Sequence, residues 1–375
     1  MKSSDNNANG LKNGTSEISL TNCSNSSSMV NDTFDTSKYA LIDLHLHLDG
    51  SMTAEDVVNM ASMEGLSINA SLTELKQQLC CPEECKNLND YLNCFHLPNM
   101  VMQSYTTIVY SMESLVKRLD EQGLIYVEIR FAPQKHIRKG MTQEKVVQAA
   151  IEGLNKGVSE SKNGIKANII LSCMRGEGND DLNEETVSLA DKYRGKGVCA
   201  IDLAGAEALY PTSKYRELFA YANQLGLPFT IHAGEAAGVE SMKLAISYGA
   251  KRIGHGIRAH DDPDTKALLK AKNICLCCCP TSNLQTKAIP MKSLKDYPLQ
   301  DFLKDEVAVC LNTDNMTVSN TTISEELKHL CEAGILSEDQ AKTLVVNAIE
   351  HAFLSDNEKA DLMKKALKRM EGQES

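Results

Sequence analysis

The chain has 375 residues, 24% of them charged, and a formal net charge of −11 at pH 7. Because acidic and basic side chains are interspersed, this composition argues against nucleic acid or an anionic membrane as the main partner and favours a small, neutral or weakly charged substrate. The 13 cysteines are irregularly spaced, which predicts reduced thiols in the cytoplasm rather than a disulfide scaffold. No apolar run approaches the length that spans a bilayer.

The first part of the chain, residues 1–37, is rich in Ser, Asn, Thr and Gly and has no apolar core. This composition predicts a disordered N-terminal tail, neither a signal peptide nor a regular element. Residues 38–372 are expected to form a single domain, since α/β barrels commonly exceed the usual domain size.

After the tail, short β-rich runs alternate with longer helical patterns. Eight runs are candidate strands: 39–44, 123–131, 166–174, 197–205, 228–234, 252–256, 274–279 and 307–313. Alternating strands and helices predict a parallel sheet, and eight such units favour a closed (β/α)₈ TIM barrel. An open, doubly wound sheet is the alternative.

A long helical pattern, residues 50–120, interrupts the alternation after the first strand, where a barrel commonly carries an active-site cap. Within it Leu88, Tyr91, Leu92 and Phe95 form one stripe at helical spacing. Such a stripe is more typical of a core face than of a gate. The pattern from about 324 to 372 predicts two or three extra C-terminal helices.

Polar residues interrupt these apolar runs where the strands end. In "LIDLHLHLDGS", His45 and His47 are two residues apart and project to one side of a strand. His232, His255 and Asp314 follow three later strands. Because barrel strands converge at their carboxyl ends, three imidazoles and a carboxylate there are a plausible ligand set for zinc or a similar divalent ion, with one position left for water.

Two of the motifs also offer an acid and a base. Such an ion lowers the pKa of bound water to near 7, and the reaction then needs a base for the water proton and an acid for the leaving side. Glu235 in "IHAGE" is the candidate acid and His255 in "RIGHG" the candidate base.

At this point the residues resemble a known family. "HLHLDGS", "YVEIRFAP", "IDLAG", "HAGE", "RIGHGIR", "CPTSN" and "LNTDN" occur in the order and approximate spacing of the adenosine deaminases of the metal-dependent amidohydrolase superfamily. The resemblance covers about residues 39–370. It implies a hydrolase of C–N bonds in cyclic amidines, which deaminates adenosine, and 2′-deoxyadenosine as well, to inosine and ammonia in cytoplasmic purine salvage.

The resemblance also implies roles for the residues at the strand ends. One Zn²⁺ per chain would be bound by His45, His47, His232 and Asp314. His255 would orient and deprotonate the attacking water, with Asp314 also holding it. Glu235 would protonate N1 of the purine as water attacks C6.

Further residues would bind the nucleoside. The backbone N–H of Gly205 would bond N3, Asp49 would hold ribose hydroxyls, and His47 would also face the substrate. The stripe of Leu88, Tyr91, Leu92 and Phe95 looks like the hydrophobic gate of the family, which gives it a role beyond the core.

Three positions depart from the pattern of the family. Asn315 stands where many members have a second aspartate that contacts N7, and its neutral amide is expected to keep that contact. Cys277 stands where a glutamate is often found, which removes a carboxylate near the metal. Ala206 replaces a common acidic residue, so that flank of the ribose site is expected to differ.

Other functions are compatible with parts of the sequence. The barrel could deaminate adenine, AMP or a thioether nucleoside such as methylthioadenosine, or it could have lost its chemistry and act in binding or signalling. A structural zinc could also sit among Cys80, Cys81, Cys85, Cys94 and His96. A small-molecule purine nucleoside is the expected partner, and the sequence leaves the oligomeric state open.

Overall fold

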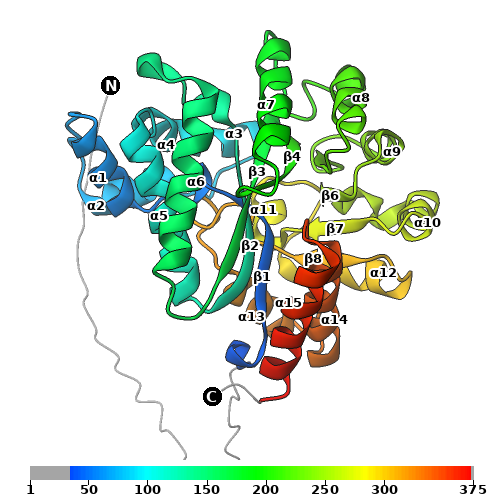
Figure 1. Ribbon diagram of the computed structural model, residues 1–375. Helices are drawn as coiled ribbons and strands as arrows, with labels where there is room; N and C mark the ends of the chain where they lie inside the picture. Colours follow the sequence, from blue (N-terminus) through cyan, green and yellow to red (C-terminus); the bar gives the residue numbers. More distant parts are fainter. Residues whose placement is uncertain (1–33, 373–375) are drawn as a thin grey trace, which may run out of the picture. The chain divides into compact units, whose positions relative to one another are not determined.

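A computed structural model describes residues 34–372, and eight parallel strands form its centre (Figure 1). They are β1 Leu41–His47, β2 Leu124–Phe131, β3 Lys166–Met174, β4 Val198–Ala204, β5 Thr230–Ala233, β6 Arg252–His255, β7 Cys275–Cys278 and β8 Val309–Leu311. Each strand lies within one of the predicted runs or overlaps it. The first prediction ended too early, because β1 continues through both histidines of the His-x-His pair.

The strands pair in chain order to form two four-stranded sheets, β1–β4 and β5–β8. Single parallel bridges join the sheets at both seams, Ile201 with Phe229 and Leu46 with Asp314. At the second seam the His47 N–H donates to the Asp314 carbonyl at 2.7 Å. The predicted (β/α)₈ barrel is therefore confirmed, and the open sheet is excluded.

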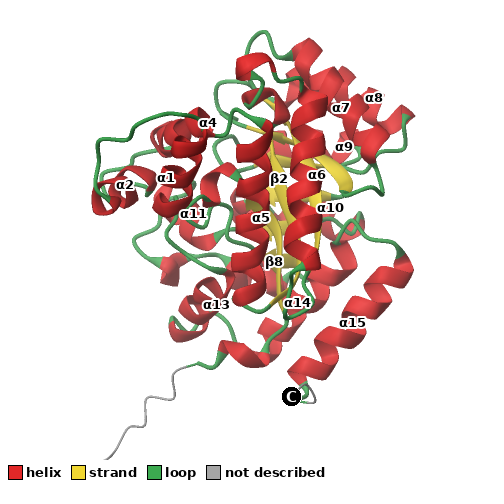
Figure 2. Cartoon of the chain, turned by 60° about the vertical axis from the view of Figure 1, so that its left-hand side comes forward, coloured by secondary structure: helices red, strands yellow, loops and turns green. Residues whose placement is uncertain are grey.

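Helices cover the outside of the strands, and α5 and α6 run beside β2 (Figure 2). Between later strands the amphipathic patterns form helices, with α6 beginning after the N-cap Thr142. The helices after β2 are α6 Gln143–Ser159, α7 Asp180–Tyr193, α8 Arg216–Gln224, α9 Val239–Tyr248, α10 Pro263–Ala271, α11 Pro280–Gln285 and α12 Leu299–Lys304. Three more close the chain, as the sequence predicts: α13 Ile323–Glu332, α14 Glu338–His351 and α15 Asp356–Met370.

The segment between β1 and β2 is helical, as predicted. Its helices are α1 Ala54–Met63, α2 Leu72–Leu79, α3 Leu88–Leu92, α4 His96–Val101 and α5 Tyr105–Glu121. Capping boxes at Thr53, Ser71 and Ser104 fix where three of them begin. Helices α1, α2 and α4 lie together at one side of the barrel (Figures 1 and 2).

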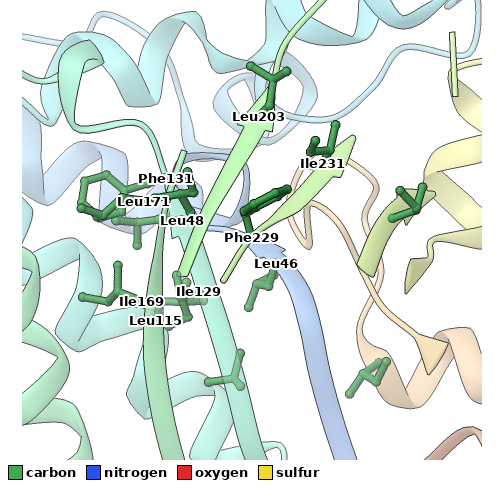
Figure 3. Close-up of a cluster of buried hydrophobic side chains, with 14 of the residues drawn as sticks. Leu46, Leu48, Leu115, Ile129, Phe131, Ile169, Leu171, Leu203, Phe229 and Ile231 are labelled. Carbon is green, nitrogen blue, oxygen red and sulfur yellow. The ribbon is translucent and has the colours of Figure 1, made fainter. Parts of the chain in front are cut away.

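The main core lies between the strands and the surrounding helices. Parallel strands covered by helices bury both faces, which explains their nearly continuous apolar runs. Figure 3 shows part of this core, where the labelled side chains are Leu46, Leu48, Leu115, Ile129, Phe131, Ile169, Leu171, Leu203, Phe229 and Ile231. Inside the barrel, two charged pairs are fully buried: Arg252 with Glu128, and Arg130 with Asp202 at 3.2 Å.

The start of the domain differs from the prediction. Residues 1–33 lie outside the described residues, but residues 34–37 have defined structure. Phe34 stacks on Tyr39 with ring centroids 5.3 Å apart, and Thr36–Lys38 forms a 3₁₀ helix whose Thr36 hydroxyl bonds Ser324. The predicted boundary at residue 37 is therefore too late. Within 34–372, no helix combines the length and apolarity required to cross a bilayer.

Candidate active site

The predicted site residues gather around one cavity of about 300 Å³ at the carboxyl ends of the strands. Its walls include His47, Asp49, Leu88, Tyr91, Leu92, Phe95, Gly205, His232, Glu235, His255, Asp314 and Asn315. His45 is the exception, since it is fully buried behind the wall. Strand ends that are far apart in sequence therefore meet here, as the barrel requires.

Four donor atoms converge at the floor of this cavity. His232 Nε2 lies 3.0 Å from His45 Nε2 and 3.2 Å from His47 Nε2. Asp314 Oδ1 lies 3.4 Å and 3.3 Å from the same two histidine nitrogens. Tetrahedral ligands about 2.0–2.1 Å from a shared ion stand about 3.3 Å apart, so these spacings fit a divalent metal.

His255 lies close to the same donors. Potential ligand atoms, one each from His45, His232, His255 and Asp314, lie within 4.8 Å of one another. His47 is a further candidate donor, because its Nε2 lies within 3.3 Å of the donor atoms of His232 and Asp314. His255 Nε2 lies 3.5 Å from the Glu235 carboxylate. His255 therefore lies beside both the donor set and Glu235.

The protonation states suit metal binding, which requires neutral imidazoles and an ionised carboxylate. Burial lowers the pKa of His45 well below its usual value and that of His47 to about 3. Burial alone would raise the pKa of Asp314, but the surrounding histidines, His255 foremost, hold it below its usual value.

Neighbouring side chains fix the orientation of the ligands. His232 Nδ1 lies 3.0 Å from Asp202 Oδ2, so that donation from Nδ1 leaves Nε2 free for the ion. Asp202 in turn pairs with Arg130. Burial alone would raise the pKa of Asp202, but His232 and Arg130 hold it below the usual value. The Ser282 hydroxyl donates to the second oxygen of Asp314 at 2.6 Å.

Glu235 and His255 face each other above the donor set. Burial, with Asp314 and Glu207 nearby, raises the pKa of Glu235 well above its usual value and so favours its protonated form. Burial lowers the pKa of His255 to about 3 and keeps it neutral. Asn283 lies 3.0 Å from His255 Nδ1 and fixes the ring. The pair thus combines a carboxyl group whose pKa is raised with a neutral imidazole.

Backbone geometry marks the same site. His255 and Asp314 both have a φ of 62°, a left-handed conformation that is uncommon outside glycine and concentrates at functional sites. Gly205, at the end of β4, has a φ of 107°, which a side chain would strain. These turns place polar groups at the cavity wall.

The other end of the cavity carries Asp49 and the apolar stripe. Asp49 is 8% exposed, and its Oδ1 has no hydrogen-bond partner within residues 34–372. Burial raises the pKa of its carboxyl to about 6. The stripe residues line the cavity, and Tyr91 is also held by a 2.7 Å bond between its hydroxyl and Ser319. The stripe therefore belongs to the pocket wall and, through Tyr91, to the core.

The three departures occupy different places. Asn315 is buried against Gly50 and faces the cavity. Cys277 lies within β7, with its sulfur 3.8 Å from that of Cys310. Ala206 lines the cavity, and the next residue, Glu207, is buried and bonds the loop after β5.

The structure adds residues that were quoted in motifs without a role. Asp202 lies in "IDLAG", and Ser282 and Asn283 lie in "CPTSN". Their functions depend on which strand lies beside which, and spacing alone does not give that. The cysteine-rich zinc alternative finds no support, since the compact metal-binding group found within 34–372 is the histidine and aspartate group.

Comparisons with known proteins agree on one family. Residues 40–369 match the family model described as adenosine deaminase. An adenosine deaminase of Haemophilus ducreyi is 47% identical over 330 residues, 87% of this chain and 95% of that protein. One from Enterococcus faecalis is 39% identical over 324 residues, 86% and 95% of the two chains. The structure of adenine deaminase from Arthrobacter aurescens aligns with a TM-score of 0.77 at 25% identity, over 89% of this chain and 99% of that one.

Proposed function

The chain belongs to the adenosine deaminase family and catalyses hydrolysis of adenosine to inosine and ammonia, and we propose that one Zn²⁺ and the residues around the cavity carry out this reaction. The observation that carries the proposal is the meeting of four metal donors with the buried carboxyl of Glu235, whose pKa is raised, in one cavity. Neither group of residues by itself would define a deamination site.

The zinc ligands in this proposal are His45, His47, His232 and Asp314. Their three nitrogens and one oxygen are the donor types that zinc prefers, and the site keeps an open side toward the cavity. A zinc ion held there would lower the pKa of a water molecule enough for hydroxide to form at neutral pH. His255 and Asp314 orient the attacking water, and His255 accepts its proton.

Glu235 acts as the acid that protonates N1 of the purine. Proton transfer to N1 draws electron density from C6 while water adds there, and this interaction is stronger in the transition state than in the ground state. The tetrahedral C6 then carries a hydroxyl and an amino group; the hydroxyl proton is transferred to the amino group, the C6–N bond breaks, and ammonia leaves as the carbonyl of inosine forms. Burial, which raises the pKa of Glu235 well above its usual value, supports this role.

The remaining wall residues bind the nucleoside. The N–H of Gly205 bonds N3, and the amide of Asn315 donates to N7. Asp49 accepts from ribose hydroxyls, which is supported by its unpartnered buried oxygen. Leu88, Tyr91, Leu92 and Phe95 close over the substrate and keep bulk water out, while His47 contacts the substrate from the metal side.

We place this activity in cytoplasmic purine salvage, with free purine nucleosides as the partners. The cysteines of the described residues are all free thiols, as a reducing compartment favours. We propose residues 34–372 as the catalytic domain, and the predicted N-terminal tail then comprises residues 1–33, which lie outside the described residues.

One observation favours a second substrate class. Lys135 lines the cavity, and its charge acts on Asp49 at the ribose end. An ammonium group there suits an anionic ribose substituent such as the 5′-phosphate of AMP. Adenine lacks the ribose that Asp49 and Lys135 would contact, so it is disfavoured.

Substrate choice and metal dependence are tested together. Turnover of adenosine, 2′-deoxyadenosine, adenine and AMP is compared by ultraviolet absorbance, with ammonia assayed in parallel. Adenosine is expected to give the highest kcat/KM, and chelation is expected to abolish activity until Zn²⁺ is restored. A higher kcat/KM for adenine or AMP would contradict the substrate assignment. Full activity in protein shown to contain no metal would contradict the zinc proposal.

A further inference from the structure

A single buried carboxylate, Glu207, joins two loops of the active site. Glu207 is 1% exposed and follows β4 by three residues. Its oxygens accept hydrogen bonds from four consecutive backbone N–H groups after β5: Gly234 at 2.8 Å, Glu235 at 3.1 Å, Ala236 at 2.8 Å and Ala237 at 2.9 Å. Hydrogen bonds to a charged acceptor are stronger than neutral ones, so this contact holds the β5 loop firmly.

The same carboxylate is fixed from behind. The Ser241 hydroxyl donates to Glu207 at 2.5 Å and lies 2.7 Å from the Thr212 hydroxyl. Arg175 donates to Thr212 at 3.0 Å and to the backbone carbonyl of His232 at 2.7 Å. The network therefore ties the Glu207 carboxylate to the backbone of a proposed metal ligand.

The position of Glu207 in the chain gives this contact a consequence for the substrate. Gly205, whose N–H is the proposed N3 donor, lies two residues before Glu207, and Glu235, the proposed N1 acid, is held by the Glu207 side chain. N1 and N3 belong to one rigid purine ring, so both contacts form together only if the two loops keep a fixed separation.

We infer that Glu207 is a positioning residue that sets the separation between the N3 donor on Gly205 and the N1 acid on Glu235. This inference rests on the proposed roles of those two residues. Glu207 also contributes, after burial and Asp314, to the raised pKa of Glu235, which agrees with a role directed at the acid.

A purely structural role makes a different prediction. The four N–H groups, two buried and two part-buried, need acceptors in any case. Loss of the acceptor would then destabilise the loop and weaken every ligand alike. A positioning role affects most the ligand that uses both contacts at once. Two analogues separate these cases, because 1-deazaadenosine lacks the N1 acceptor and 3-deazaadenosine lacks the N3 acceptor.

The test compares adenosine turnover with inhibition by the two analogues in Glu207→Gln. The amide keeps the size of the side chain but cannot accept all of the N–H bonds. We expect kcat for adenosine to fall about 100-fold, as misplacement of a reacting group by about 1 Å does. The inhibition constants of the analogues are expected to change less than about 3-fold. Each analogue can make only one of the two contacts, so its binding does not depend on the separation between Gly205 and Glu235.

Two further variants keep the test decisive if Glu207→Gln does not fold. Ser241→Ala removes one of the five bonds and is expected to lower kcat about 10-fold with the same selectivity, as one hydrogen bond to a charged group would. Asp120→Asn is the matched control, because Asp120 is a buried carboxylate that accepts from the N–H groups of Lys162 and Asn163 in a loop outside the cavity. It is expected to lower stability and to leave kcat unchanged.

The outcomes separate the two levels of the argument. In one outcome, the wild-type protein turns over adenosine normally, but the Glu207 and Ser241 variants lose kcat for adenosine and affinity for both analogues by equal factors. This outcome overturns the positioning role alone. An unchanged kcat in both variants does the same. If wild-type protein binds adenosine no more tightly than the two analogues, the N1 and N3 contacts themselves are wrong, and both proposals fall.

Discussion

Glu235 shows how surroundings decide the chemistry of a single side chain. An exposed glutamate is ionised at neutral pH, but burial and two nearby carboxylates raise the pKa of Glu235 well above its usual value and so favour the protonated form. Glu235→Gln should therefore lower kcat by about 10²–10⁴-fold, because the amide cannot serve as the N1 acid. Steady-state kinetics and metal analysis check this, with bound zinc expected to be unchanged.

The matched control for this variant is Glu240→Gln. Glu240 lies on α9, close in sequence to Glu235, and its side chain is 80% exposed. Its variant should keep the wild-type kcat. If Glu235→Gln also keeps nearly normal kcat with the metal in place, Glu235 is not the acid.

Strand β6 makes room for the metal site by lacking a side chain. A Cβ at Gly254 would lie 2.7 Å from His45 Cε1, closer than real Cβ contacts occur. Gly254→Ala should therefore displace the His45 ring and weaken metal binding by roughly 10-fold or more, since ligand orientation governs affinity. Competition with a metal chelator measures the change, and Gly238→Ala, with no atom within 4 Å of the new methyl group, should bind as the wild type does. Equal metal affinity in both variants would show that His45 does not need this space.

At the level of elements, the sequence predicts the strands well and their side-to-side contacts poorly. All eight strands and the histidines at their ends follow from apolar runs interrupted by polar residues. Asp202 and Glu207 act across the β4–β5 seam, so their roles depend on strand neighbours that periodicity does not specify. The predicted start of the domain, residue 38, is also too late. The polar composition of the first residues predicts a tail, but the ring of Phe34 packs on Tyr39 and joins residues 34–37 to the domain.

The whole molecule is expected to lose stability as pH rises, through Glu326. Burial raises the pKa of this carboxyl to about 7, whereas the unfolded chain titrates near 4.5. Between these values the folded protein holds a proton that the unfolded chain releases, so each rise in pH favours unfolding. The full loss in the free energy of unfolding is on the order of 3 kcal/mol; it is present above pH 7 and absent below about pH 4.5.

Replacing Glu326 by glutamine removes this titration. The stability that Glu326→Gln gains over the wild type should therefore be larger at pH 8 than at pH 5. Urea-unfolding midpoints of both proteins at the two pH values measure this gain. Glu332→Gln, at an exposed position near the end of the same helix, should show no such change. A Glu326→Gln difference that is equal at both pH values would mean that Glu326 is ionised in the folded protein at both.

The seam between β8 and β1 also constrains the order of assembly. Asp314 donates its N–H to the His45 carbonyl at 2.8 Å, so two proposed ligands from nearly opposite ends of the domain are brought together by the last strand to be synthesised. Contacts this distant in sequence form slowly, because a long loop must close first. A nascent chain that ends before Asp314 therefore lacks one of the proposed donors. Binding of the ion would then report completion of the ring, and protein kept without a metal would be folded but not yet an enzyme.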